Sequence, residues 1–239
     1  MSTPLLAVEG LRKTFGGIVA VNGVRFQVAP QEIVGIIGPN GSGKSTLFNL
    51  ISGVLRPDAG RIIFRGQDIT GWKPHQIARL GIGRTFQIPA VFTTMTAWDN
   101  LLTAAVEADW AHAPQRAEQL LALLTLDAVR DVRANSLSGG QQKLLELGRV
   151  LMRNPTLILL DEVTAGVHPT LRTVMLDVVR ELRRSGTTFL VIEHDMELVR
   201  TLCDRILVMD FGEVIASGTF AEIAAHPDVI EAYLGRRVS

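Results

Sequence analysis

The sequence predicts an α/β fold with three parts: a β-rich N-terminal layer, an α/β core and a helical insertion near the middle of the chain. Three observations predict it. The first 30 residues carry strand patterns, short apolar segments elsewhere are separated by helical ones, and residues from about 91 to 153 show only helical patterns.

The N-terminal layer is expected to consist of strands. Val24, Phe26 and Val28 alternate with polar or small residues, which is the period-2 pattern of a half-buried strand. Residues 61–64 form a further short strand, and we expect the Gly66-Gln67-Asp68 sequence to form the turn that follows it.

The core strands have a different character, because they are short, aliphatic and nearly continuously apolar. Such segments are typical of parallel strands that are covered on both faces. They are residues 32–37, 156–160, 188–192 and 205–209.

The clearest helix lies between the second and third of these strands, at residues 171–184. Apolar residues recur there at i, i+3, i+4, i+7, i+8 and i+11 from Leu171, and Gly186 follows where a helix often ends. In the insertion, the sequence from Thr96 to Asp99 has the pattern of a capping box, and Leu120, Leu121 and Leu124 provide the apolar side of a second helix.

Composition excludes several classes of protein. The chain has 239 residues, and 24 Lys and Arg balance 24 Asp and Glu, so no basic surface for nucleic acid is indicated. One Cys fits a reducing compartment. Neither a signal peptide nor an apolar run of about 20 residues is recognisable, so we expect a soluble, cytoplasmic protein that reaches a membrane only through a partner.

A phosphate-binding loop is predicted after the first core strand. Residues 38–45, Gly-Pro-Asn-Gly-Ser-Gly-Lys-Ser, match the G-x-x-x-x-G-K-[ST] pattern between a strand and a helix expected at 45–52. The glycines let backbone N–H groups point inward, and the helix N-terminus favours negative charge. We expect the loop and the following Thr46 to bind the phosphates of a nucleotide, with Lys44 on the β- and γ-phosphates and Ser45 on Mg²⁺. The loop residues are Gly38, Pro39, Asn40, Gly41, Ser42, Gly43, Lys44 and Ser45.

An acidic pair, Asp161 and Glu162, ends the second core strand. Ligands of open α/β sheets bind beyond the carboxyl ends of the strands. We therefore expect Asp161 to hold Mg²⁺ and Glu162 to polarise the attacking water. Alone, the pair would equally suit a solvated turn, and its place beside the phosphate-binding loop favours the catalytic interpretation.

A short glycine-containing turn, Leu137-Ser138-Gly139-Gly140-Gln141, precedes a helix that runs to about Met152. Ser138 and Gln141 form a capping box, so the turn alone would indicate only a well-capped helix. Combined with the phosphate-binding loop and the acidic strand, it makes the chain resemble the ATP-binding subunits of ABC transporters over essentially its whole length.

The resemblance implies a P-loop NTPase fold of the ABC type. We expect a mainly parallel core sheet with an N-terminal antiparallel β layer and a helical subdomain. It implies a single ATPase domain over residues 1–239, with the β layer and the RecA-like core in 1–90 and 154–239 and the helical subdomain in 91–153. The implied activity is ATP hydrolysis with Mg²⁺, coupled to transport.

The resemblance also implies a head-to-tail dimer with two composite sites. In this family the signature turn contacts the γ-phosphate of ATP held by the opposing subunit, and a helix N-terminus suits that contact. The signature residues that would do so here are Ser138, Gly139, Gly140 and Gln141.

Three further residues match family positions. Phe15 resembles the aromatic residue that stacks on adenine, although an ordinary core Phe remains the alternative. Gln87 resembles the glutamine that senses Mg²⁺ and water and links the helical subdomain to the core. His194 resembles the switch histidine near the γ-phosphate, so we group it with Glu162 and Gln87 as catalytic.

The chain departs from the family pattern at two positions. Val163 stands where Pro is usual, which should be tolerated because Pro there only stiffens a turn. His168 stands where Asp or Asn is usual. A His there would either make communication between the two sites pH-sensitive or donate the same hydrogen bond.

Local sequences resemble the importers of branched-chain and other hydrophobic amino acids. That subgroup also includes urea or amide importers and a lipopolysaccharide-extraction ATPase, which remain alternatives. The sequences are Phe15-Gly16-Gly17, Ala20-Val21, Gly81 to Gln87, Ala165-Gly166, Ile192 to Met196 and Tyr233-Leu234-Gly235.

Residues 88–92, Ile-Pro-Ala-Val-Phe, follow Gln87 directly and are apolar. In the family this region lines the groove for the coupling helix of the membrane subunit, while packing inside the helical insertion is the alternative. We expect transmembrane permease subunits and a second ATPase subunit as partners, identical or not, and a substrate-binding protein indirectly. We expect no nucleic acid, and a peripheral location on the cytoplasmic face of the inner membrane.

Two rival functions fit the sequence less well. ABC ATPases of ribosomes usually hold two cassettes, and those of DNA repair insert a long coiled coil, whereas this chain has one phosphate-binding loop and fewer than 100 residues between it and the signature turn. A non-hydrolysing binding module would lack Glu162 or His194, and both are present.

Overall fold

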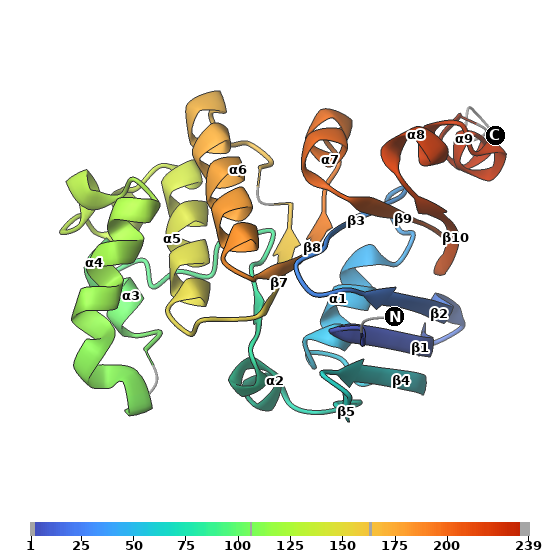
Figure 1. Ribbon diagram of the computed structural model, residues 1–239, viewed down its shortest axis with the longest axis horizontal. Helices are drawn as coiled ribbons and strands as arrows, with labels where there is room; N and C mark the ends of the chain where they lie inside the picture. The colour runs from blue at the N-terminus through green and yellow to red at the C-terminus, as the bar shows by residue number, and fades with distance from the viewer. Residues whose placement is uncertain (1–2, 106, 163, 235–239) are drawn as a thin grey trace.

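Two β-sheets organise the chain in the computed structural model, which describes residues 3–105, 107–162 and 164–234 (Figure 1). The smaller sheet is antiparallel, with strand order β2-β1-β4-β5. Its strands are β1 (Leu6–Phe15), β2 (Ile18–Val28), β4 (Ala59–Phe64) and β5 (Gln67–Asp68). Val24, Phe26 and Val28 are buried and the residues between them are exposed, which confirms the predicted alternation.

The turn after β4 lies earlier than the sequence predicted. Arg65 and Gly66 have positive φ angles of 52° and 77°, as in a two-residue hairpin turn. Gln67 and Asp68 are therefore free to pair with Phe64 and Ile63 in β5 rather than forming the turn themselves.

The larger sheet is the core, with strand order β10-β9-β3-β8-β7-β6. All neighbouring pairs are parallel except β10, which runs antiparallel to β9. The predicted mainly parallel sheet is confirmed, while β6 and β10 extend it at its two edges. Its strands are β3 (Ile33–Ile37), β6 (Ile82–Arg84), β7 (Leu157–Asp161), β8 (Thr188–Ile192), β9 (Arg205–Asp210) and β10 (Glu213–Gly218).

The two faces of the core sheet contact different layers. Alternate residues such as Val34 and Leu190 pack with α1 (Lys44–Ile51) and the antiparallel sheet. The residues between them, such as Ile158 and Phe189, pack against α5 (Gly139–Leu151) and α6 (Pro169–Arg184). Burial on both faces explains why the core strands are almost entirely apolar.

The named elements from Ala97 to Leu151 are all helical in the described residues, and they form one end of the molecule (Figure 1). They are α3 (Ala97–Leu102), η1 (Glu107–His112), α4 (Ala113–Leu123), η2 (Asp127–Val129), η3 (Ala134–Ser136) and α5. The predicted capping boxes at Thr96 and Ser138 are present, and they set the starts of α3 and α5.

The C-terminal end of α6 also follows the prediction. Gly186 has a φ of 108°, and the N–H groups of Gly186 and Thr187 donate to carbonyls of the last helical turn. The remaining helices are α2 (Pro74–Leu80), α7 (Met196–Leu202), α8 (Phe220–Ala224) and α9 (Pro227–Leu234). Among the described helices, none is long and apolar enough to cross a bilayer.

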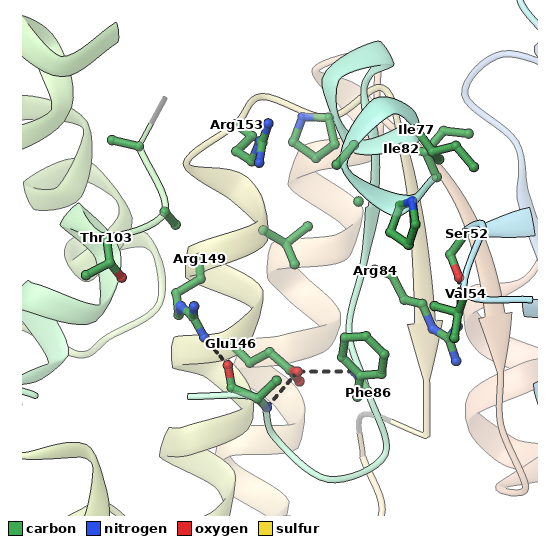
Figure 2. A pocket seen from close by; sticks show the side chains of 18 residues that line it. Ser52, Val54, Ile77, Ile82, Arg84, Phe86, Thr103, Glu146, Arg149 and Arg153 are labelled. Atoms are coloured by element: carbon green, nitrogen blue, oxygen red, sulfur yellow. Dashed lines mark hydrogen bonds between the residues drawn. The ribbon is translucent and has the colours of Figure 1, made fainter. Parts of the chain in front are cut away.

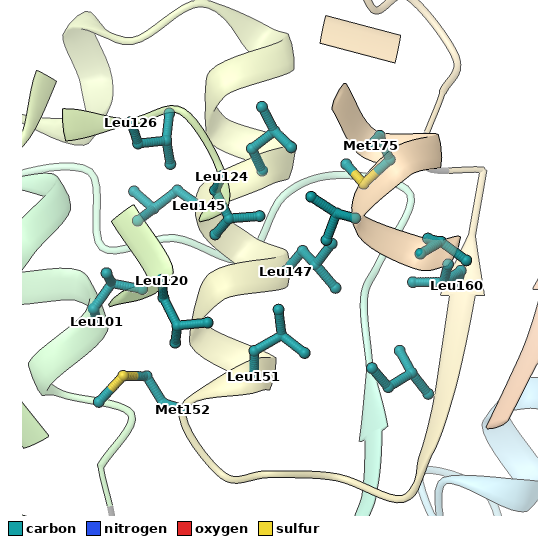
Figure 3. Close-up of a cluster of buried hydrophobic side chains, with 14 of the residues drawn as sticks. Leu101, Leu120, Leu124, Leu126, Leu145, Leu147, Leu151, Met152, Leu160 and Met175 are labelled. Atoms are coloured by element: carbon teal, nitrogen blue, oxygen red, sulfur yellow. The ribbon is translucent and has the colours of Figure 1, made fainter. Parts of the chain in front are cut away.

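Leucine side chains on α5 join the helical end to the core sheet. Figure 3 shows Leu145, Leu147 and Leu151 between Leu120, on α4, and Leu160, on β7. All five side chains are at most 2% exposed. The helices and the sheet therefore share one hydrophobic cluster.

Leu120→Ala tests the packing of this cluster. We expect the free energy of unfolding in urea to fall by about 2–5 kcal/mol, because the substitution removes buried methyl groups and leaves a cavity. Ile88→Ala is the control, since Ile88 is 81% exposed and its truncation should change stability by less than about 0.5 kcal/mol. Equal effects of the two substitutions would contradict a tightly packed cluster.

Candidate nucleotide-binding site

The phosphate-binding loop connects β3 to α1 and is pressed against neighbouring backbone. Gly38 and Gly43 have φ angles of 151° and 101°, which favour glycine. A Cβ atom on Gly38 would lie 2.1 Å from the Met209 carbonyl oxygen, and one on Gly43 would lie 2.2 Å from the Ala20 carbonyl oxygen. Both glycines are therefore required by close backbone approach.

Lys44 turns its side chain into this loop. Its Nζ donates to the carbonyl oxygens of Gly38 at 2.8 Å and Pro39 at 3.0 Å, and the residue is only 6% exposed. Burial lowers the pKa of Lys44, while the carboxylates of Glu162 and Asp161 act in the opposite direction. An ammonium group is thus held where a phosphate chain would meet the loop.

The other predicted loop residues lie around Lys44. Ser42 is buried, Asn40 and Gly41 are exposed, and Ser45 and Thr46 lie in the first turn of α1 with Ser45 exposed. The start of α1 thereby presents backbone N–H groups and a hydroxyl at the same end of the helix.

Asp161 ends β7 in a buried position and is 5% exposed. Arg84, at the end of β6, donates to Asp161 Oδ2 at 3.2 Å. The same guanidinium donates to Asn49 Oδ1 at 2.7 Å and Ser52 Oγ at 2.8 Å on the side of α1. Burial raises the pKa of Asp161, and the charge of Arg84 opposes that shift.

The three residues predicted to be catalytic meet at one point. Gln87 Nε2 donates to Glu162 Oε2 at 2.9 Å, and His194 Nε2 lies 2.8 Å from Glu162 Oε1. The three side chains come from the segments that follow β6, β7 and β8, so the parallel sheet gathers them at its carboxyl edge.

The signature turn is exposed at the start of α5. Ser138 Oγ accepts from Gln141 N at 3.3 Å, and Ser138 N donates to Gln141 Oε1 at 2.9 Å. A Cβ atom on Gly139 would meet no atom within 4 Å, whereas one on Gly140 would lie 2.8 Å from Leu171 Cδ1. Ser138 and Gly139 therefore face open space while Gly140 packs against α6.

Phe15 lies at the end of β1 and is 45% exposed, so the alternative of an ordinary core Phe is wrong. Its ring centroid lies 5.6 Å from Lys13 Nζ. Lys13 is itself held by Asp58 at 2.7 Å. An exposed aromatic ring beside a fixed cation can accept a stacked base.

Residues 88–92 divide between surface and core. Ile88 and Phe92 are exposed, whereas Val91 is half-buried and packs against the helical cluster. The guanidinium of Arg149 lies 4.6 Å from the centroid of the Phe92 ring. Beside them is a groove of about 420 Å³ that runs between α2, α5 and the end of β6 (Figure 2).

Glu146 anchors the backbone of the segment that contains Gln87. Its Oε1 accepts from the N–H groups of Phe86 at 3.2 Å and Ala90 at 2.9 Å, and Arg149 donates to the Ala90 carbonyl (Figure 2). Glu146 is 4% exposed, and burial raises its pKa to about 7.

His168 caps α6. Its Nδ1 accepts from Thr170 N at 3.4 Å, so the ring closes the first turn of the helix, and its part in communication between two sites stays a prediction. An Asp or Asn oxygen would make the same kind of contact. The other departure, Val163, lies outside the described residues.

Four buried charged residues at this edge were not predicted as site residues: Arg84, Lys143, Glu146 and Glu193. Lys143 and Glu146 stand at i and i+3 on the largely apolar α5, and Glu193 follows the apolar β8. Charged residues within such segments are the one signal that could have identified them.

Glu146→Gln should remove a pH-dependent loss of stability. The unfolded chain ionises Glu146 near the ordinary pKa of 4.5 and the folded chain near 7, so folding stability falls as the pH rises between these values. A glutamine oxygen still accepts from Phe86 and Ala90 without ionising. Thermal melts should show that Glu146→Gln raises the free energy of unfolding by on the order of 2 kcal/mol relative to the native chain at pH 8. At pH 5 the difference should be small. The exposed Glu181→Gln is the control, and a gain that is equal at both pH values would contradict the interpretation.

Comparison with known families and structures agrees with this geometry. Residues 21–165 match the ABC transporter family, and residues 213–239 match the branched-chain amino acid ATP-binding cassette transporter family. The chain is 42% identical to the probable branched-chain amino acid transport ATP-binding protein LivG of Archaeoglobus fulgidus, over 98% of this chain and 97% of that protein. It is 40% identical to the high-affinity LivG protein of Escherichia coli strain K12, over 98% and 99% of the two chains.

Solved structures give the same result. A nucleotide-free ATP-binding cassette from an ABC transporter superposes with a TM-score of 0.88 at 38% identity, covering 98% of this chain and all of that one. A cassette described as a dimer in a post-hydrolysis state, bound to ADP and phosphate, superposes with a TM-score of 0.80 at 26% identity over 90% and 98% of the chains. The chain belongs to the ATP-binding protein family of ABC transporters, which includes branched-chain amino acid transport ATP-binding proteins.

Proposed function

We propose that this chain hydrolyses ATP to drive an ABC importer for branched-chain and other hydrophobic amino acids. The observation that carries the hydrolytic part is the position of Glu162, held between Gln87 and His194 beside the phosphate-binding loop. The names of the relatives and the match over residues 213–239 support the cargo, in preference to urea, amides or lipopolysaccharide.

The residues around the loop fit a nucleoside triphosphate. The N–H groups at the start of α1 and the ammonium of Lys44 complement the phosphate charge, and the exposed ring of Phe15 offers a stacking surface for adenine. Ser45 and Asp161 would hold Mg²⁺, since Ser45 supplies a hydroxyl next to Lys44 and Asp161 supplies a carboxylate whose charge acts on Lys44. When bound, Mg²⁺ neutralises charge on the phosphates during transfer.

Hydrolysis then depends on how Glu162 is oriented. Its two carboxylate oxygens are already engaged by Gln87 and His194, so the group has a fixed direction before water arrives. Glu162 accepts a proton from the attacking water, and His194 orients the carboxylate through its Nε2. Gln87 links this site to the helical region, because Glu146, on α5, accepts hydrogen bonds from the backbone on both sides of Gln87.

A second ATPase subunit completes each site. The exposed Ser138 and Gly139 present the N-terminus of α5 to a nucleotide on an opposing subunit. We propose that the helical region, residues 91–153, moves as a unit and that the signature turn moves with it.

The membrane subunit docks on the exposed apolar surface formed by Ile88 and Phe92 and the neighbouring groove. The chain thereby lies peripherally on the cytoplasmic face of the membrane. Because this surface adjoins Gln87, docking and the catalytic residues share one segment.

Glu162→Gln should separate binding from hydrolysis. The variant keeps its size and one acceptor but loses the charge, so ATP should bind normally while hydrolysis falls by at least about 10²-fold. A fluorescent-ATP titration and phosphate release would measure the two quantities, with the exposed Glu181→Gln as control. Size exclusion with Mg-ATP should show an ATP-bound dimer with the natural partner subunit.

Two results would contradict this assignment. Near-normal turnover in Glu162→Gln would mean that the water is activated elsewhere, with His194 the next candidate. Abolished ATP binding would mean that Glu162 rather than Asp161 holds the metal.

Ile88→Glu should uncouple transport from hydrolysis. Ile88 is 81% exposed, so the charge should leave the fold and the ATPase activity of the free chain within about twofold. Amino acid uptake by vesicles that contain the assembled transporter should fall strongly, because a charge is buried at the docking surface. Ile230→Glu, on α9, is the control. Normal uptake in Ile88→Glu would exclude this surface as the docking site.

A further inference from the structure

Lys143 connects the signature helix to the backbone of the catalytic loop. Its Nζ donates to the carbonyl oxygens of Glu162 and Ala165, each at 2.8 Å. Lys143 lies on α5, five residues after Ser138, and is 8% exposed. One buried ammonium therefore contacts the segment that follows β7 at two residues, Glu162 and Ala165.

A buried ammonium is costly unless its surroundings compensate the charge. Burial lowers the pKa of Lys143, and the carboxylates of Glu193, Glu162 and Glu146 oppose that shift. Two of its three N–H donors are used by the loop carbonyls. Removing Lys143 would take this donor away from both carbonyls at once.

The loop after β7 needs support because its backbone is strained at Glu162. Glu162 has a φ of 49°, in the left-handed region that costs a non-glycine residue free energy. Lys143 holds the carbonyl of this residue from the side of α5. Glu193 holds the loop from the side of β8, since its Oε1 accepts from Thr164 N at 3.2 Å and Oγ1 at 3.0 Å.

We propose that Lys143 is a positioning residue for ATP hydrolysis, which fixes the backbone of Glu162 and links it to the signature turn of the same chain. This inference rests on the proposed role of Glu162. Ser138 and Lys143 belong to one rigid helix, separated by about 7.5 Å along its axis. A contact between Ser138 and the nucleotide of the opposing subunit therefore acts, through Lys143, on the carboxylate of this subunit's own site.

The test compares Lys143→Met, Lys143→Arg and the control Lys73→Met in the full-length chain, assembled with its transporter partners. Lys73 is exposed at the start of α2. Methionine keeps most of the length of lysine but loses both hydrogen bonds, whereas arginine keeps the charge and donors. Each substitution is also combined with Glu162→Gln, and single-turnover hydrolysis, KM for ATP and thermal stability are measured.

Lys143→Met should lower kcat by roughly 10- to 100-fold, the scale of a misplaced catalytic group, with KM changed by less than about threefold. Lys143→Arg should recover part of the rate, and Lys73→Met should behave as the native chain. In the Glu162→Gln background, Lys143→Met should cause no further loss, because a residue that acts through Glu162 has nothing left to position.

Three results would overturn the proposal. Normal turnover in Lys143→Met would reject it while leaving the role of Glu162 intact. Additional loss in the Glu162→Gln background, or loss of rate that matches loss of stability and is not recovered by arginine, would indicate a purely structural lysine. Near-normal turnover in Glu162→Gln alone would reject the proposed function, and the positioning role with it.

Discussion

The carboxyl ends of β6, β7 and β8 meet at one edge of the core sheet, where charged groups have been removed from water. Three cations and three carboxyl groups are buried there, so each loses hydration that neighbouring charges and backbone groups must replace. They do so by bonding the backbone of the loops: Lys44 binds the phosphate-binding loop, Lys143 and Glu193 the loop after β7, and Glu146 the loop after β6. The buried groups are Lys44, Arg84, Lys143, Glu146, Asp161 and Glu193.

This arrangement explains why the three side chains proposed to be catalytic lie together. Glu162, Gln87 and His194 stand on loops, which alone would be free to move. Because their backbones are tied to buried charges, the side chains meet at 2.8–2.9 Å. The apolar layers on both sides of the sheet bury the strands from which these loops emerge, and so fix where the loops begin.

The sequence predicted those features that are encoded locally. The phosphate-binding loop, the two capping boxes and the apolar core strands are each contiguous, and the parallel strand order then gathers Gln87, Glu162 and His194. Features that depend on distant partners were missed. The strand β6 has three residues and is defined by its pairing with β7, and Arg84 becomes a site residue only because that pairing brings it to Asp161. Lys143 and Glu146 belong to a helix whose apolar pattern gave no indication of which loops it would meet.

The hydrophobic cluster shared by α4, α5, α6 and the core sheet has a mechanical consequence. Since Leu147 and Leu160 belong to the same buried cluster, the helical end is packed directly against the core sheet and is not joined to it by linkers alone. A movement of α5 relative to β7 that kept these leucines in contact would be a shear of small amplitude. Such a shear would act over a broad contact, so that a displacement at the docking surface proposed around Ile88 and Phe92 would reach the nucleotide-binding end with little loss as elastic deformation.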